Sequence, residues 1–201
     1  MEDAVDANKY FRGLCSYLNT NAYEITKRDN GRIVLEEKIF LAGGAERKQK
    51  VRLGFSGEVI ALKLDRKNQR GNTDPLFHFL EDDAKPWSKR CDFVIFQLYR
   101  NKLSVYCIEF KSSTLPDSLV DQLASTESWC KAVQSIISLY TNEKKRLYLR
   151  KFVFSCMDEP SRFVDDEGYI KRDHSVRHYH YDDLNGMKLE ELDNQCPVLV
   201  G

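Results

Sequence analysis

The sequence predicts a single α/β domain with a mixed central sheet flanked by helices. Two apolar runs, Phe93 to Tyr99 and Leu103 to Phe110, are rich in the β-branched and aromatic residues that favour strands. A long helix is expected from about Asp117 to Tyr140, followed by a strand between Arg146 and Met157. A strand, a long helix and a second strand in succession indicate a crossover connection, so part of the sheet is expected to be parallel.

Composition sets limits on the class of protein. The 201 residues suffice for one domain, for which we expect a core at 6–157 and a polar C-terminal extension at 158–201. Lys and Arg number 31 and so do Asp and Glu, so any surface that binds nucleic acid must be local. No apolar run is long enough to cross a bilayer, so no membrane association is expected.

The cysteines and the N-terminus indicate the compartment. Six cysteines are scattered without a Cys-x-x-Cys pair, which favours reduced thiols over a zinc site. The acidic N-terminus lacks the basic and apolar regions of a signal peptide. We therefore expect a cytoplasmic protein, or a nuclear one in a eukaryotic cell.

The part of the chain before the hairpin is expected to hold one helix and several strands. Residues 6–18 have apolar side chains at helical spacing, and 25–64 contain apolar runs typical of strands. Residues 45–51 are polar and basic, and a solvated turn is expected there, with contact to phosphates as the alternative. Residues 65–73 read as an exposed basic loop, and 75–80 as a short helix or lid.

The hairpin carries the chemistry. If Arg100 and Asn101 form a two-residue loop, Tyr99 pairs with Lys102, and counting outward places Asp92 opposite Glu109. Lys111 lies two residues beyond Glu109 and therefore projects from the same face. Opposed carboxylates destabilise a sheet, and a divalent cation such as Mg²⁺ would relieve the repulsion.

An aspartate, a hairpin and then Glu-x-Lys resemble the core of the PD-(D/E)xK nuclease superfamily, most clearly between residues 90 and 129. Asp92 corresponds to the metal-binding aspartate and Glu109-Phe110-Lys111 to the (D/E)-x-K motif, in which the carbonyl of the middle residue also contacts the metal. Cys91 stands where the motif has proline. The expected order of elements also matches the αβββαβ, restriction-endonuclease-like core of that superfamily.

The resemblance implies two further polar residues at the site. The superfamily usually adds an acid from an element upstream of the aspartate, for which Glu58 is one candidate and Glu24 another. The helix after the Glu-x-Lys strand often contributes a polar residue from its first turns, and Gln122 stands there, with Asp121 as the alternative. Three histidines lie close together at 174, 178 and 180. His174 and His178 have the spacing of a helical metal-binding pair, but no third ligand is spaced to complete a metal site.

The function implied is metal-dependent hydrolysis of nucleic-acid phosphodiester bonds by an endonuclease that uses Mg²⁺ or Mn²⁺. Asp92, Glu109 and the carbonyl of Phe110 would hold the metal, and Lys111 would stabilise charge that develops on the phosphate. DNA is expected as the substrate in preference to RNA. The alternative is a catalytically silent module on the same fold that binds nucleic acid or a protein partner within a larger assembly, and a homo-oligomer is compatible with either.

Overall fold

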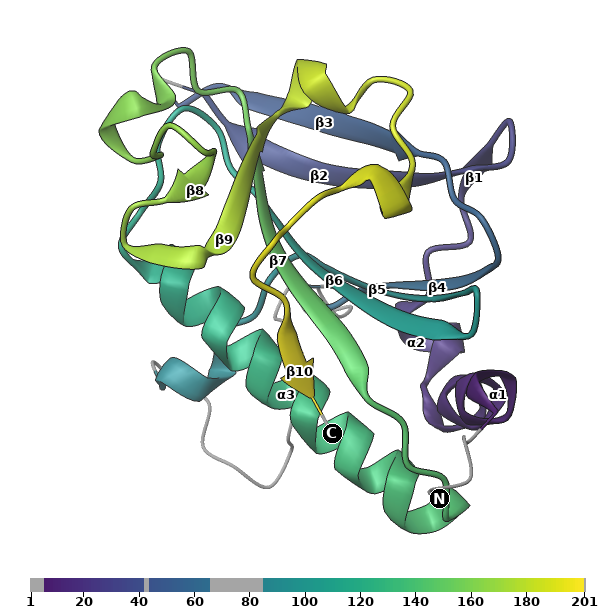
Figure 1. Ribbon diagram of the computed structural model, residues 1–201. Helices are drawn as coiled ribbons and strands as arrows, with labels where there is room; N and C mark the ends of the chain where they lie inside the picture. The colour runs from purple at the N-terminus through teal and green to yellow at the C-terminus, as the bar shows by residue number, and fades with distance from the viewer. Residues whose placement is uncertain (1–5, 42–43, 66–84, 201) are drawn as a thin grey trace.

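A seven-stranded mixed sheet forms the centre of the molecule, which a computed structural model describes at residues 6–41, 44–65 and 85–200 (Figure 1). Its strands are β4 (Glu58–Lys63), β5 (Phe93–Tyr99), β6 (Lys102–Phe110), β7 (Leu147–Ser155), β8 (Tyr169–Ile170), β9 (Asp173–His180) and β10 (Val198–Val200). The order across the sheet is β4-β5-β6-β7-β9-β8, and β10 pairs with the first residues of β7. The pairs β6-β7 and β7-β9 are parallel, and the remaining pairs are antiparallel. The α/β class and the mixed sheet are as expected.

The predicted register of the β5-β6 hairpin is confirmed. Tyr99 pairs with Lys102, so the loop has two residues, and both have positive φ, 49° at Arg100 and 58° at Asn101. Positive φ at both central positions defines the turn whose twist matches that of the flanking strands. The side-chain oxygen of Asn101 also accepts a hydrogen bond of 3.2 Å from the Ala7 N–H. The turn therefore also anchors the start of the first helix.

The two faces of the sheet are covered differently. Helices α1 (Ala7–Tyr17) and α3 (Ser118–Thr141) pack against one face, together with the short α2 (Thr20–Tyr23) near the edge strand β4 (Figure 1). A smaller antiparallel sheet covers the other face and consists of β1 (Arg28–Asp29), β2 (Arg32–Phe40) and β3 (Glu46–Leu53). The predicted flanking helices therefore lie on one face of the sheet, whereas strands cover the other. Short 3-10 turns complete the structure: η1 (Pro86–Ser88), η2 (Pro160–Arg162), η3 (Tyr181–Leu184) and η4 (Leu189–Glu191).

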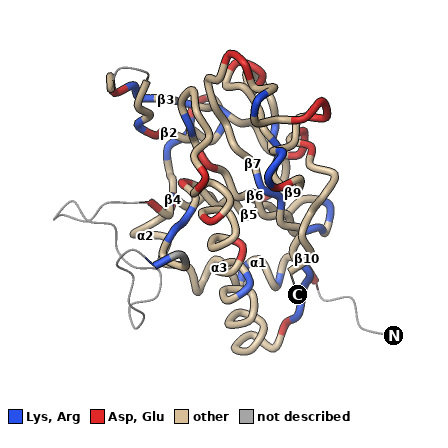
Figure 2. The backbone as a smooth tube through the Cα atoms, turned by 90° about the vertical axis from the view of Figure 1, so that its left-hand side faces the viewer, with Lys and Arg blue, Asp and Glu red and all other residues tan. Residues whose placement is uncertain are grey.

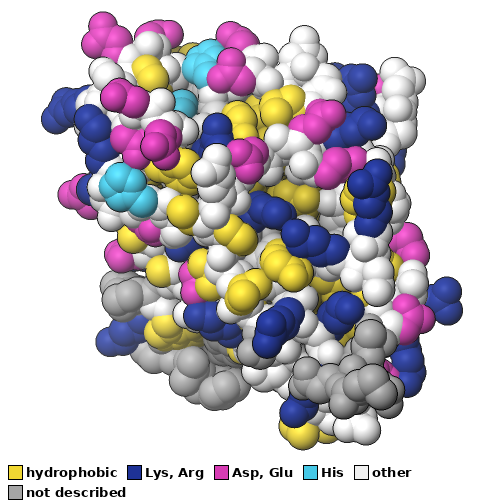
Figure 3. Space-filling model, in the orientation of Figure 1, with side chains coloured by type: hydrophobic (Ala, Val, Ile, Leu, Met, Phe, Trp, Pro, Cys, Tyr) yellow, Lys and Arg dark blue, Asp and Glu magenta, His cyan; other side chains and the backbone are white. Residues whose placement is uncertain are grey.

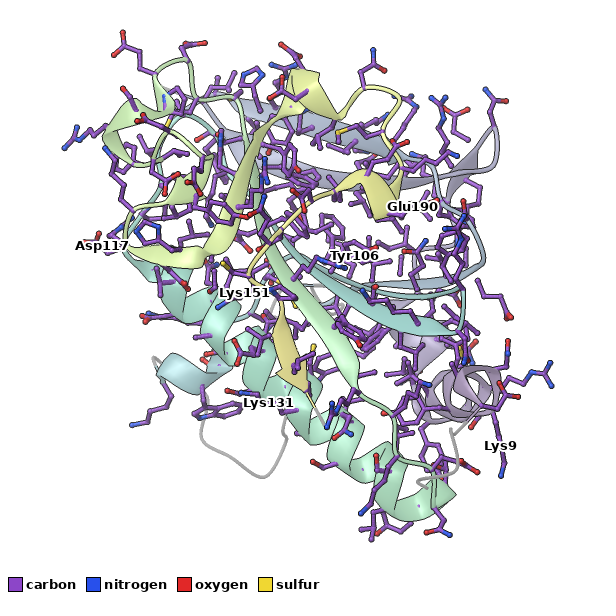
Figure 4. The ribbon with its side chains drawn as sticks, in the orientation of Figure 1. Lys9, Tyr106, Asp117, Lys131, Lys151 and Glu190 are labelled. Atoms are coloured by element: carbon purple, nitrogen blue, oxygen red, sulfur yellow. The ribbon has the colours of Figure 1, made fainter. Side chains whose placement is uncertain are left out.

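Each face of the main sheet buries a group of polar side chains that pair with one another. On the helical face Lys151 is 5 % exposed, and its ammonium lies 3.5 Å from Glu127 of α3 and 3.3 Å from Asp173 of β9. On the other face the Tyr106 hydroxyl donates to Gln97 at 2.7 Å, and the Gln97 amide donates to Glu190 at 3.0 Å. Figure 4 labels Lys151, Tyr106 and Glu190 in these two layers. Pairing is required because an unpaired buried polar group costs about 1–3 kcal/mol.

Two regions differ from the sequence-based expectation. Residues 45–51 were expected to form a turn, but they form most of β3, because Gln49, Val51 and Leu53 alternate as buried residues with exposed neighbours. The extension at 158–201 was expected to be irregular, yet it supplies β8, β9 and β10 to the main sheet and Ile170, Val176 and others to the core. The core therefore continues past residue 157.

The long helix predicted at 117–140 and the strand predicted at 146–157 are confirmed as α3 and β7. All six cysteines are free, as expected for reduced thiols. The basic loop within 65–73 and the helix or lid at 75–80 fall on residues 66–84, outside the described residues. In the part of the chain that is described, no helix combines the length and apolarity that a membrane span requires.

Candidate active site

The candidate site lies at one edge of the main sheet. Strand pairing brings the carboxyl ends of β4, β6, β7 and β9 to the same edge, where Lys63 pairs with Phe93 and Ser155 pairs with His180. Antiparallel β5 begins at this edge, so Asp92, which directly precedes it, meets Glu109 near the end of β6. Ligand sites of open α/β sheets commonly lie outside the carboxyl ends of the strands.

Asp92 and Glu109 are in direct contact through backbone groups. The Asp92 N–H donates to Glu109 Oε2 at 3.1 Å, and the Phe110 N–H donates to Asp92 Oδ2 at 2.6 Å. Both residues are nearly inaccessible, with Asp92 7 % and Glu109 2 % exposed. The two carboxylates therefore close the open end of the hairpin, as the counted register predicts.

Lys111 completes the cluster. Its ammonium forms an ion pair with Glu109 Oε1, and its side chain is 18 % exposed. The Lys111 carbonyl accepts a hydrogen bond of 2.9 Å from the Tyr181 hydroxyl, and the Lys111 N–H donates to the Phe154 carbonyl at 2.8 Å. Neighbouring segments thus hold the backbone of the lysine on both sides.

Burial raises the pKa of both carboxyl groups. Burial is the largest cause of the raised pKa of Asp92, and the charge of Glu109 adds to it, while the Phe110 N–H opposes the rise. Burial also raises the pKa of Glu109, and the Lys111 ammonium partly offsets that effect. Perturbed acids at a strand edge are a feature of functional sites, although ion-pair networks produce them as well.

Phe110 serves the site through its backbone and the core through its ring. The ring packs edge-on against Phe93 at 5.1 Å and against Tyr181 at 5.4 Å between centroids. Phe110 is 4 % exposed and belongs to the core between the two sheets. This packing keeps the peptide groups on either side of Phe110 at the edge where the carboxylates meet.

Gln122 lies on the helix that borders the site. In the first turns of α3, Asp121 pairs with Lys89 at 2.7 Å, and the Thr126 hydroxyl accepts from the Cys91 N–H at 2.8 Å. These contacts place α3 along the segment that leads into Asp92. Gln122 Oε1 is buried and has no hydrogen-bond partner within the described part of the chain. An unsatisfied acceptor is the state expected of a group that awaits a water or a ligand.

The predicted upstream acids do not join the cluster. Glu58 pairs with Leu98 at the end of β4 next to the hairpin turn, about 17 Å along the strand from the Lys63 end that faces Asp92. Glu24 forms an isolated bridge with Leu62 on the outer side of β4. The placement of Glu58 in the site was therefore wrong, because antiparallel pairing sends its end of β4 away from the carboxylates.

Two other acids act on the pair, and sequence reasoning missed both. Asp65 lies two residues after the end of β4, and its charge raises the pKa of Glu109. The charge of Glu37 raises the pKa of Asp92. Glu37 lies on β2 among residues of the inner face and pairs with Lys63 at 2.6 Å. A carboxylate directly after an apolar run was the available signal for Asp65. Glu37 had none, since its position depends on how the small sheet packs on the large one.

The histidines of the extension have separate partners. His178 Nε2 lies 2.8 Å from the Ser155 hydroxyl, and burial lowers the pKa of His178 to about 4. His174 lies 3.1 Å from Asp165, and His180 accepts the Asp182 N–H at the start of η3. Over residues 6–41, 44–65 and 85–200, no three or more His, Cys, Asp or Glu side chains group as metal ligands.

Comparisons with known proteins add no relative. No protein-family model matches the chain, and neither the curated proteins nor the solved structures give a match. The case for a function therefore depends on the residues and geometry of this chain.

Proposed function

We propose that this protein is a metal-dependent nuclease that hydrolyses phosphodiester bonds, an endonuclease that acts on DNA in preference to RNA. One observation carries the proposal: the hairpin register brings two buried carboxylates and a lysine into contact at the carboxyl edge of the sheet. Two buried carboxylates side by side do not stabilise a fold, so the presence of Asp92 and Glu109 at this position favours a functional role.

The donor set fits Mg²⁺ or Mn²⁺. Magnesium is commonly held by one or two carboxylates, with waters and substrate phosphates in the remaining positions. Asp92 and Glu109 would supply the carboxylates, and the Phe110 carbonyl would be a further oxygen ligand. A divalent cation would also offset the charge of Glu109, which together with burial raises the pKa of Asp92.

The order of elements supports a restriction-endonuclease-like core. Helix α1, strands β4, β5 and β6, helix α3 and strand β7 follow one another as in αβββαβ, with β1–β3 inserted after the first helix. Asp92 directly precedes the second strand of that series, and Glu109-Phe110-Lys111 spans the end of the third. This agreement is independent of the contacts between the side chains.

The roles of the residues follow from their positions. A bound metal would neutralise the scissile phosphate and lower the pKa of an attacking water. Lys111 would hold a positive charge where negative charge develops on the phosphate. Gln122 would orient a water or a phosphate oxygen through its unpartnered side-chain oxygen.

The test is cleavage of single- and double-stranded DNA and RNA with Mg²⁺ or Mn²⁺. The parent protein is expected to cut in a metal-dependent manner, and Glu109→Ala is expected to abolish cutting. Lys111→Met should reduce the rate by about 10²–10³-fold, the range seen when one charge-stabilising donor is removed. Lys131→Met is the matched control, because Lys131 lies exposed on α3 (Figure 4). Equal cleavage by Glu109→Ala and the parent would refute the site.

One observation favours the catalytically silent alternative. Both Glu109 oxygens already have partners within the chain, as does one oxygen of Asp92. Such internal satisfaction is also what a scaffold without catalysis would retain. Absence of cutting, together with absence of stabilisation by Mg²⁺, would select this module.

A further inference from the structure

The outer face of the small sheet carries a concentration of positive charge. On β3, Lys48, Lys50 and Arg52 are exposed and alternate with the buried residues Gln49, Val51 and Leu53. The side chains of Lys48 and Lys50 are 62 % and 40 % exposed. Side chains two residues apart on a strand share a face and lie about 6.8 Å apart, so the three cations form a row of about 14 Å.

Two carboxylates lie among these cations: Arg52 pairs separately with Asp29 at 2.6 Å, and the lysines share Glu36. Glu36 of β2 pairs with Lys27 at 3.0 Å, with Lys50 at 3.4 Å and with Lys48. The hydrogen bonds from Lys48 and Lys27 lower the pKa of Glu36 to about 2. One negative charge cannot neutralise three ammonium groups, so the cluster keeps an excess of positive charge.

The excess is local to this sheet. Residues 27–53 contain eight Lys or Arg and four Asp or Glu, in a chain whose formal net charge is zero. Figure 2 shows Lys and Arg along β3 and beside β2, at the end of the molecule away from α3. The face in Figure 3, by contrast, carries acidic and basic side chains side by side. A polyanion would therefore complement the positive charge of the outer face.

We propose that the outer face of β2 and β3 binds the phosphate backbone of nucleic acid without reading its sequence. A row of about 14 Å corresponds to the axial rise of roughly four phosphates of one strand. Proteins that hold single strands through their bases stack successive bases on several aromatic side chains. Among the described residues of this sheet, Phe40 at the end of β2 is the one exposed large aromatic, 59 % exposed, so contact with the phosphates is favoured over contact with the bases. Backbone contacts set position and carry no sequence information.

The proposed surface adjoins the candidate active site. Glu36 faces outward and its neighbour Glu37 faces inward, where its charge acts on Asp92. Lys63 of β4 links the two, because its ammonium donates to the Glu36 carbonyl at 3.2 Å and pairs with Glu37 at 2.6 Å. A strand held on the outer face would thus be retained close to the carboxylates. This placement depends on the proposed nuclease function, but the binding itself does not.

The experiment measures binding in EDTA, where metal-dependent hydrolysis cannot occur. Fluorescence anisotropy would follow a labelled random-sequence duplex of about 30 base pairs, and its single strand, across a salt series. Lys48→Gln/Lys50→Gln should weaken binding about tenfold or more near 50 mM salt. The slope of log K against log salt should become less negative by about 2. Glu36→Gln should tighten binding, because it removes the carboxylate that Lys27, Lys48 and Lys50 share.

The control removes two charges elsewhere. Lys9→Gln/Lys131→Gln changes exposed lysines of α1 and α3, each paired with one carboxylate, and should bind as the parent does. Thermal melts of every variant would establish folding.

The proposal is overturned if both double variants weaken binding equally, or if Glu36→Gln fails to tighten it. It is also overturned if the parent binds no nucleic acid at low salt, which would leave an acidic protein surface as the partner. If binding depends on the lysines but the protein never cuts, the nuclease proposal is refuted and the binding surface is supported. If the protein cuts equally well without the lysines, the binding surface is refuted and the nuclease proposal is supported.

Discussion

Replacing Asp92 by asparagine should stabilise the protein at alkaline pH. The Asp92 pKa is raised by burial first and by Glu109 second, so the folded protein holds this proton more tightly than the unfolded chain. The unfolded pKa is about 3.9, and each unit of elevation removes about 1.4 kcal/mol from the free energy of unfolding once the pH exceeds the folded-state value. An asparagine carries no charge and keeps an oxygen for the Phe110 N–H.

The magnitude follows from that linkage. Above the folded-state pKa the variant gains about 1.4 kcal/mol for each unit by which burial and Glu109 raise the Asp92 pKa. In a domain of this size each kcal/mol raises the melting temperature by roughly 2–4 °C. Because the raised pKa favours folding only while the proton is bound, the advantage of the variant should shrink as the pH falls and vanish below about 4.

The assay is urea unfolding, followed by circular dichroism, of parent and variant between pH 5 and pH 8. Asp121→Asn is the matched control, since the Asp121 side chain is 53 % exposed and should change stability by less than about 0.5 kcal/mol at any pH. A variant less stable than the parent at pH 8, or a difference that does not change with pH, would refute the reasoning.

Three other perturbations test neighbouring parts of the argument. Mg²⁺ at about ten times its dissociation constant should raise the unfolding free energy of the parent by about 1.4 kcal/mol and leave that of Asp92→Asn nearly unchanged. Differential scanning fluorimetry would measure both, and equal shifts in melting temperature for parent and variant would place the metal elsewhere. Tyr181→Phe removes the hydrogen bond to the Lys111 carbonyl and should cost about 0.5–1.5 kcal/mol in urea unfolding, with no loss expected if the hydroxyl is solvated instead. Asn101→Ala should cost about 1–2 kcal/mol, because alanine tolerates positive φ poorly and cannot accept the Ala7 N–H; Asn101→Gly, which restores the conformation alone, should recover part of the loss.

The hairpin could be predicted because its information is local. Two runs of β-branched and aromatic residues flank a polar dipeptide, and a two-residue loop fixes the register of every pair beyond it. The contact between Asp92 and Glu109, and the position of Lys111 beside them, follow from counting alone. Helix α3 was predictable for the same reason, since its apolar residues recur within one segment.

The rest of the site could not be predicted from the sequence, because it depends on which elements pack together. Glu58 sits in an apolar strand, as expected, but the antiparallel partner of that strand decides which end faces the carboxylates. Residues 45–51 look like a solvated turn because one face of β3 is exposed and the other includes the polar Gln49, 8 % exposed. Polarity alone therefore did not separate a half-exposed strand from a loop.

The sequence by itself determined the α/β class, the hairpin register, the long helix and the triad of Asp92, Glu109 and Lys111. Only the tertiary structure decided that Tyr181, 70 residues further along the chain, would hold Lys111, and that Glu37 would reach Asp92 from a second sheet. The physical reason is that an apolar pattern reports which face of an element is buried. It does not report which other face covers it, because hydrophobic burial is non-directional and many pairings satisfy it equally.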